Sequence, residues 1–382
     1  MLLAYGFRVF FLLAALLGVS FVPIWPGVFA GHMRLATPLG PIGWHSHEML
    51  FGFTVAVLAG FLLTAVRNWT QRMTAEGSLL GLLALLWLAG RVALLVPALP
   101  WQLVMAADLA FLPALAVVVA RPIFGAKSRR NYAFPVLLLV LSGANALLHL
   151  APHGIAPDFG RAAIYVALDA VLLIMAIVGG RIVPNFTANA IQGTYRQRGR
   201  IDQLALGGLT VLLVVDALPW LPTQVSAGVA LVTGLFHLAR MRGWNSWATR
   251  RVPLLAVLHA GYALVGLGLL LLGVARLWPR LPLTAATHVL TVGAIGGLTL
   301  GMMTRVALGH TGRPLVLPRS LVVAYLLVLL ATIARALVSL WPARLYLVAL
   351  TVPATLWGLA FLLYLVVYVP ILVRPRADGK PG

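Results

Sequence analysis

The chain has 382 residues, of which 62% are hydrophobic and 9% are charged, and its mean hydropathy is +1.00. These values exclude a soluble globular protein, because repeated runs of about 20 apolar residues are membrane spans. The formal charge of +20 is also explained by a membrane protein. The arginines stand in short connections between spans, so the expected partner is the lipid bilayer and not nucleic acid. The absence of cysteine excludes disulfides, iron–sulfur clusters and thiolate zinc sites.

Charged and turn-forming residues divide the chain into about twelve transmembrane helices. The expected fold is an all-α integral membrane protein, with residues 1–382 in one polytopic domain and a short cytoplasmic tail at 373–382. The predicted spans are 9–29, 46–66, 78–96, 101–120, 132–151, 161–180, 203–219, 224–239, 253–275, 283–304, 320–341 and 346–372.

The basic residues are distributed unequally across this topology. Of the 28 Lys and Arg residues, five face one side, two lie within spans and the remaining 21 face the other side. The five are Arg34, Arg161, Arg276, Arg280 and Arg344, and the two within spans are Arg91 and Arg335. The side richer in Lys and Arg is normally cytoplasmic, so both termini are expected in the cytoplasm.

The second span opens with three ionisable residues, His45, His47 and Glu48, in the segment WHSHEMLFGF at 44–53. Such groups are costly in a bilayer unless they are partnered or functional. Residues two apart on a helix point about 200° away from each other, so the two histidines cannot both face one metal unless the helix begins after His45. Glu48 could fix the ring of the ligating histidine through a hydrogen bond. The alternative is that these histidines are polar residues of the headgroup zone.

The tenth span begins at His288 and repeats features of the second span. The aligned pairs, all at one offset of 241 residues, are His47 with His288, Gly52 with Gly293, and Gly60 with Gly301. The end of the sixth span, VPNFT at 183–187, also matches VRNWT at 66–70. The pattern favours three successive four-helix units. Chance similarity among apolar helices that contain glycine is the alternative.

The histidines fall into groups by predicted depth. The outer group contains candidate metal or haem ligands, with Glu48 beside them: His45, His47, His149 and His288. The inner group contains His259 and His310, for which two hydrogen-bonded, solvated histidines are the alternative. His32, His153 and His237 are expected at the surface.

Several charged residues lie within predicted spans. Arg91 and Asp108, on the third and fourth spans, are expected to form an ion pair. Asp169, Asp216 and Arg335 lie on other spans. Arg91 and Arg335 could instead bind haem propionates, and the aspartates could relay protons, with mutual pairing as the simpler alternative.

Three long segments together resemble the NnrS family of bacterial inner-membrane proteins. They are WHSHEMLFG at 44–52, GGRIVPNFT at 179–187, and the stretch from His288 through MMTR at 302–305 to GHTGRP at 309–314. The tail, with YVPIL at 368–372 and RPR at 374–376, is of the same type. The resemblance implies a multi-pass protein of the inner membrane that contains haem, expected to be of b type, and copper. It also implies an association with the nitric oxide response and denitrification.

A more distant resemblance is to the main subunit of haem–copper oxidases, in which twelve helices form three four-helix arcs. That subunit holds its low-spin haem between histidines of helices 2 and 10. By this resemblance His47 and His288 are expected to be axial haem ligands, with His45 as the substitute. The chain departs from that family because helices 6 and 7 carry no histidine, so the familiar copper site is missing. Copper would need His45, His149, or the inner His259 and His310.

The expected function is therefore that of a haem protein, with copper as a further cofactor, that handles or senses nitric oxide and limits nitrosative stress. Two alternatives remain open from the sequence. One is a quinol-linked nitric oxide reductase, whose electron entry site and proton path the sequence does not identify. The other is a transporter of a metal or small anion, with the outer histidine cluster as its gate. Whether the protein is an enzyme stays open.

Overall fold

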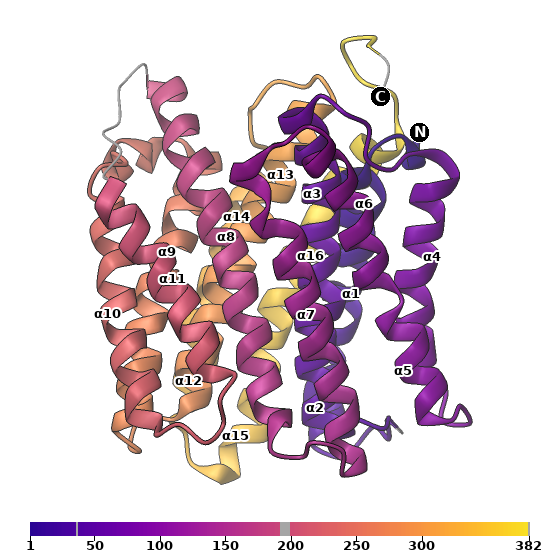
Figure 1. The fold of residues 1–382 in the computed structure, drawn as a ribbon. Helices are drawn as coiled ribbons and strands as arrows, with labels where there is room; N and C mark the ends of the chain where they lie inside the picture. The colour runs from indigo at the N-terminus through magenta and orange to yellow at the C-terminus, as the bar shows by residue number, and fades with distance from the viewer. Residues whose placement is uncertain (36, 192–198, 381–382) are drawn as a thin grey trace. The chain divides into compact units, whose positions relative to one another are not determined.

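The computed structural model describes residues 1–35, 37–191 and 199–380. These residues form helices joined by short connections, and no strand occurs among them (Figure 1). Residues 192–198, part of a predicted connection, lie outside the described ranges. The all-α prediction is confirmed, as expected for helices that satisfy their own backbone groups in lipid.

Each of the twelve predicted spans coincides with a helical stretch of the described residues. Nine of these stretches are long and apolar enough to cross a membrane, counted over the same residues. The stretches formed by α4 (Gly77–Ala93), α9 (Gly199–Asp216) and α10 (Thr223–Met241) are not among the nine. The chain is therefore a multi-pass membrane protein, and a total of twelve crossings remains a prediction.

Contacts within the chain divide it into two compact units. Unit 1 comprises Met1–Ala167, Met303–Pro314 and Tyr364–Gly382, and unit 2 comprises Leu168–Met302 and Leu315–Leu363. This division differs from the three four-helix units that the sequence favoured. The reason is that the ends of the tenth and twelfth helical stretches group with the N-terminal helices.

Unit 1 is built around one long, almost entirely buried helical stretch, which consists of α2 (Gly40–His47), η2 (Glu48–Thr54) and α3 (Val55–Thr70). α1 packs along α3, α4 packs along α5, and α6 packs along α7. Its other elements are η1 (Leu2–Ala4), α1 (Gly6–Phe29), α5 (Trp101–Leu109), α6 (Phe111–Gly125), η3 (Arg129–Asn131), α7 (Ala133–Leu150), η4 (Ala151–His153) and the start of α8 (Phe159–Ile191).

Arg8 joins the two ends of the chain within unit 1. Its Nη1 donates to the carbonyl oxygens of Leu372 (2.6 Å) and Arg374 (2.8 Å), at the C-terminal end of α16 (Thr351–Val373). A buried guanidinium thereby satisfies carbonyls that a helix end leaves without partners. Figure 1 shows the N- and C-termini at the same end of this unit. The termini share one side, as predicted, while the identity of that side remains a prediction.

Unit 2 contains the remainder of α8 and the helices that follow it. α10 packs along both α9 and α11, and a Cβ added at Gly234 would lie 2.7 Å from the carbonyl oxygen of Gly266. Small residues allow such close helix packing in membranes. Its other elements are η5 (Ser246–Arg251), α11 (Pro253–Leu277), α12 (Leu283–His288), η6 (Val289–Ile295), the first part of α13 (Gly296–His310), α14 (Arg319–Val338), α15 (Ala343–Ala349) and the first part of α16.

The second and tenth helical stretches contain π-helical segments at matching positions. η2 directly follows His47 and η6 directly follows His288, and each segment has seven residues. The offset of 241 residues that aligns the two sequences therefore also aligns two uncommon backbone features. π-Helical turns are rare and frequently lie at functional sites. The matching segments support a relationship between the two helices and direct attention to the residues around them.

Candidate metal centre

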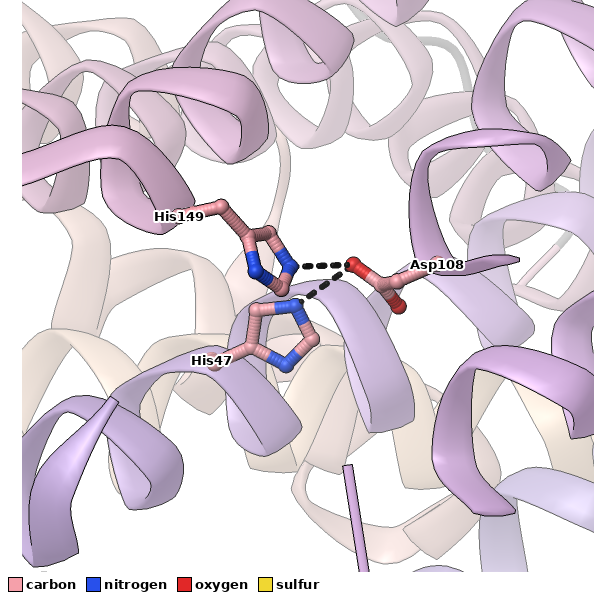
Figure 2. Close-up of side chains that lie close together, drawn as sticks. All are labelled: His47, Asp108 and His149. Atoms are coloured by element: carbon pink, nitrogen blue, oxygen red, sulfur yellow. Dashed lines mark hydrogen bonds and ion pairs between the residues drawn. The ribbon is translucent and has the colours of Figure 1, made fainter. Parts of the chain in front are cut away.

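Two histidines and one aspartate of unit 1 meet at a single carboxylate oxygen (Figure 2). Nε2 of His47 lies 2.8 Å from Oδ2 of Asp108, and Nε2 of His149 lies 3.0 Å from the same atom. The three side chains come from α2, α5 and α7, and all are buried. Their ligand atoms lie within 4.8 Å of one another. Within the described ranges this is the group of His and carboxylate side chains that could hold a metal ion.

Helix α2 determines which histidine enters the group. Because the helix already begins at Gly40, His45 and His47 point in different directions, as helix geometry predicts. The ring of His45 stacks on Trp25, with 4.4 Å between ring centroids. His47 therefore faces the candidate site, and His45 lies outside it.

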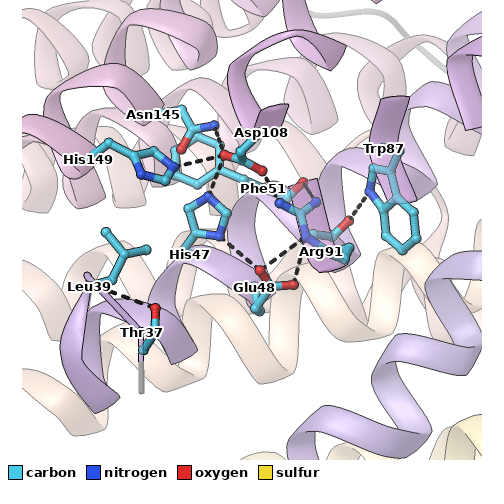
Figure 3. Close-up of polar contacts among 11 residues, drawn as sticks. Thr37, Leu39, His47, Glu48, Phe51, Trp87, Arg91, Asp108, Asn145 and His149 are labelled. Carbon is cyan, nitrogen blue, oxygen red and sulfur yellow. Dashed lines mark hydrogen bonds and ion pairs between the residues drawn. The ribbon is translucent and has the colours of Figure 1, made fainter. Parts of the chain in front are cut away.

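A surrounding layer of charged groups orients the three residues (Figure 3). Nδ1 of His47 lies 3.0 Å from Oε1 of Glu48, the first residue of η2. Arg91, near the end of α4, bridges the two acids: its Nε donates to Glu48 Oε1 at 3.1 Å and its Nη2 donates to Asp108 Oδ1. The predicted ion pair of Arg91 and Asp108 is confirmed, and it extends to Glu48.

Asn145 adds a third group to the same oxygen of Asp108. It lies one helical turn before His149 on α7, and its Nδ2 donates to Asp108 Oδ2 at 2.6 Å. Its own Oδ1 is buried and has no hydrogen-bond partner among the described residues. A buried oxygen in that state is unfavourable, so a water molecule or a ligand with a hydrogen-bond donor would be stabilised beside it.

Two side chains of α4 donate hydrogen bonds to backbone carbonyls of the π-helical segment η2. Nε1 of Trp87 donates to the carbonyl of Gly52 at 3.1 Å, and Nη1 of Arg91 donates to the carbonyl of Phe51 at 3.4 Å. Gly90 permits a second close approach, because a Cβ there would lie 2.5 Å from Asp108 Oδ1 and 2.9 Å from its Cα. Glycine at position 90 therefore allows α5 to bring Asp108 against α4.

An apolar cluster adjoins the polar network on the side where α2 and α5 begin. Its buried members are Leu39, Trp44, Ala93, Leu94 and Val104. Trp44 precedes His47, and Val104 precedes Asp108, by about one helical turn each. The cluster therefore lies one turn closer to these helix ends than the charged groups do. Apolar packing there excludes water and strengthens the electrostatic interactions of the network.

The other residues predicted to contact haem have different surroundings. His288 belongs to unit 2, where its Nδ1 donates to the carbonyl of Thr284 at 2.7 Å. Arg335 donates to the hydroxyl groups of Ser339 (2.7 Å) and Tyr346 (3.2 Å). Since His47 belongs to unit 1 and His288 to unit 2, the haem predicted between them remains a prediction.

The two histidines of the predicted inner group also belong to different units. In unit 2, Nε2 of His259 lies 2.8 Å from Thr187 Oγ1 and its Nδ1 lies 2.9 Å from Ser246 Oγ. In unit 1, the ring of His310 contacts that of Phe7, with 5.7 Å between centroids. His259 thus has the hydrogen bonds expected of a structural histidine, and an inner metal site remains a prediction.

The prediction that His237 is a surface residue is wrong. The side chain is fully buried, its Nδ1 lies 2.9 Å from the hydroxyl of Tyr262, and its Nε2 donates to the carbonyl of Ala205 at 3.1 Å. Arg240 donates to the same hydroxyl at 2.6 Å and pairs with Asp202 at 2.6 Å. Its place near a helix end suggested solvent, whereas protein groups satisfy the ring.

The comparison with protein families covers all of these residues. No curated protein matches the chain. The family described as NnrS protein matches residues 1–376, which is nearly the whole chain and includes His47, Asp108 and His149. The chain belongs to the NnrS family.

Proposed function

We propose that this protein binds a copper ion through His47, Asp108 and His149, and that this centre handles or senses nitric oxide and so limits nitrosative stress. The observation that carries the proposal is the convergence of two imidazole nitrogens on one buried carboxylate oxygen. The NnrS family is linked to the nitric oxide response. This link is the reason for proposing nitric oxide as the small molecule that the centre handles or senses.

The spacing of the three ligand atoms supports a metal ion. Bonds from a metal to nitrogen or oxygen are about 2.0–2.2 Å long, which separates neighbouring ligand atoms by roughly 3.3 Å. The two nitrogen–oxygen distances are 2.8 and 3.0 Å, so these two pairs would separate by only a few tenths of an ångström, and all three ligand atoms already lie within 4.8 Å of one another. Asn145, whose Oδ1 is buried without a hydrogen-bond partner among the described residues, contacts the same carboxylate through its Nδ2.

The charge of the cluster favours a monovalent ion. When both imidazoles are neutral, the carboxylates of Glu48 and Asp108 and the guanidinium of Arg91 leave one net negative charge. A buried net charge is unfavourable. Cu(I) would neutralise the cluster, whereas Zn²⁺ or Fe²⁺ would leave it with one positive charge. Imidazole is a suitable ligand for copper.

The surrounding side chains prepare the ligands for this role. Glu48 accepts a hydrogen bond from the Nδ1–H group of His47, which leaves the lone pair of Nε2 directed toward the site. Arg91 holds Asp108 through Oδ1 and leaves Oδ2 for the metal. A copper ion held by His47, Asp108 and His149 would retain room for a further small ligand, and copper would supply redox chemistry toward nitric oxide.

The two residues predicted to be axial haem ligands, His47 and His288, differ in the partners of their ring nitrogens. Nε2 of His47 lies 2.8 Å from Asp108 Oδ2, so a metal bound to this nitrogen would share it with that carboxylate oxygen, as the proposed copper ion would. Nδ1 of His288 donates to a backbone carbonyl, which selects the tautomer whose Nε2 carries the lone pair. We therefore assign the proposed haem ligation to His288 and the proposed copper ligation to His47.

Metal analysis and absorbance spectra of the purified full-length protein test the proposal. We expect copper in the wild type, loss of copper in His47→Ala, His149→Ala and Asp108→Asn, and retention in His45→Ala. His45→Ala is a matched control because this histidine lies on the same helix and stacks on Trp25. A haem absorbance band that changes in His288→Ala but not in His47→Ala would support the separate assignments.

A cellular measurement links the metal to nitric oxide. Cells that produce His149→Ala should lose protection against nitric oxide, whereas cells that produce His45→Ala at the same level should keep it. A wild-type protein without metal and without colour would contradict the proposal and support the transporter instead. If copper persists in both His47→Ala and His149→Ala, other residues bind it and the proposed centre is wrong.

A further inference from the structure

Unit 2 contains a buried carboxyl group that lies apart from the candidate metal centre. Asp169 lies within α8, its exposed fraction is 0%, and neither carboxyl oxygen has a hydrogen-bond partner among the described residues. It interacts electrostatically with Asp216, the last residue of α9, and with Arg276, near the end of α11. Among the described residues, Asp216 would repel a negative charge on Asp169 and Arg276 would attract it.

The neighbouring charges already balance each other. Nη2 of Arg276 lies 2.6 Å from Oδ2 of Asp216, and the two side chains are only 6% and 5% exposed. An ionised Asp169 would therefore add an uncompensated negative charge to a buried site without any hydrogen-bond donor on its oxygens. Burial strongly disfavours such a carboxylate. A carboxyl group that carries a proton removes the charge.

The surroundings fit a proton better than a metal cation. Hard cations such as Na⁺ or Ca²⁺ require several oxygen ligands, whereas a proton requires one carboxyl oxygen. Oδ2 of Asp216 is occupied by Arg276, and Asp169 does not belong to the His/carboxylate group with metal-ligand spacing in the described chain. The cluster therefore contains one carboxyl group that can carry a proton, that of Asp169, and the Asp216–Arg276 ion pair near it.

We propose that Asp169 is an exchangeable proton-binding site within the membrane-embedded part of unit 2. In the protonated state Arg276 pairs with Asp216. Release of the proton to water converts the Asp169 carboxyl group to a carboxylate, which then competes with Asp216 for the guanidinium of Arg276. The step moves one proton and no electron, and it is independent of the proposed copper centre.

Infrared spectroscopy of the purified full-length protein tests this directly, because a protonated carboxyl group has its own C=O stretching band. At neutral pH we expect such a band in the wild type, its loss in Asp169→Asn, and its retention in the matched control Asp158→Asn, whose side chain is exposed. In D₂O the band should shift as the proton exchanges, and a rise in pH should remove it.

Three results would overturn the proposal. The first is the same set of carboxylic acid bands in the wild type and in folded Asp169→Asn. The second is a band that does not shift after prolonged exposure to D₂O, because that proton would be permanently trapped. The third is a band abolished by NaCl at constant pH, because that site would bind a cation. If Asp169→Asn does not fold, wild-type protein with ¹³C-labelled aspartate carboxyl groups identifies an aspartic acid band by its isotope shift, and Asp169→Glu should move that band.

Discussion

η2 and η6 occupy matching positions in the second and tenth helical stretches, and η2 follows a histidine that joins a charged cluster. The residue after the histidine is Glu48 in one segment and Val289 in the other. Nδ1 of His47 lies against a carboxylate, whereas Nδ1 of His288 donates to a carbonyl of its own helix. The backbone pattern is thus shared, whereas the side chains beside the two histidines differ.

The neighbouring helices account for much of this difference. Around η2, α4 and α5 contribute Arg91 and Asp108. Around η6, the position of Gly293 faces a methyl group of Thr332 from α14 and Leu264 from α11. These groups beside Gly293 are apolar or hydroxyl groups, in contrast to the charged groups beside η2. The comparison therefore predicts that equivalent substitutions at the two segments have different consequences for metal content.

Removal of Asp108 should have the largest effect. Asp108→Ala deprives buried Arg91 of one of its two carboxylate partners and removes the oxygen on which His47 and His149 converge. Loss of one member of a buried ion pair costs about 3–5 kcal/mol, so we expect a large fall in the thermal unfolding midpoint and loss of copper. Asp158→Ala, at an exposed position, is the control. A stable Asp108→Ala protein that retains copper would contradict the assigned role.

Glycine substitutions within the two π-helical segments compare them directly. A Cβ at Gly52 would lie 2.7 Å from Glu48 Oε2, and one at Gly293 would lie 2.8 Å from Thr332 Cγ2. Both Gly52→Ala and Gly293→Ala should lower stability by about 1–3 kcal/mol through overpacking. Only Gly52→Ala should also reduce copper content, because it displaces Glu48. Equal copper loss in both variants, measured alongside unfolding midpoints, would show that the segments do not differ in this way.

A change confined to charge gives a finer test of η2. Glu48→Gln keeps the size of the side chain but weakens its hold on His47 Nδ1 and its pair with Arg91. Loss of a group that orients a metal ligand lowers metal affinity by roughly 10–100-fold. We expect a decrease of this size in competition titrations with a copper chelator, while Val289→Leu in η6 should leave the affinity unchanged. An unaltered affinity in Glu48→Gln would exclude Glu48 from the centre.

Much of the fold follows from the sequence, but the site follows only in part. Apolar runs predict the helices, and helical geometry predicts that His45 and His47 diverge. The proposed role of Asp108 as a third ligand could not be predicted, because it depends on the close approach of α5 to α4 at Gly90. The burial of His237 was missed for a similar reason, since its partner Tyr262 lies 25 residues away in the chain. Spacing on one helix is visible in a sequence, whereas contacts between helices are not.

The smallest effect is expected at His259, where the sequence suggested a second metal site. Ser246→Ala removes the hydroxyl group 2.9 Å from His259 Nδ1, and loss of one hydrogen bond of this kind costs about 1 kcal/mol. The unfolding midpoint should fall slightly and copper content should stay constant, because Thr187 still contacts Nε2 of the ring. His259→Ala should likewise keep all of its copper. If metal content instead fell by one equivalent in His259→Ala, then His259 would be a ligand, and unit 2 would contain a metal centre of its own.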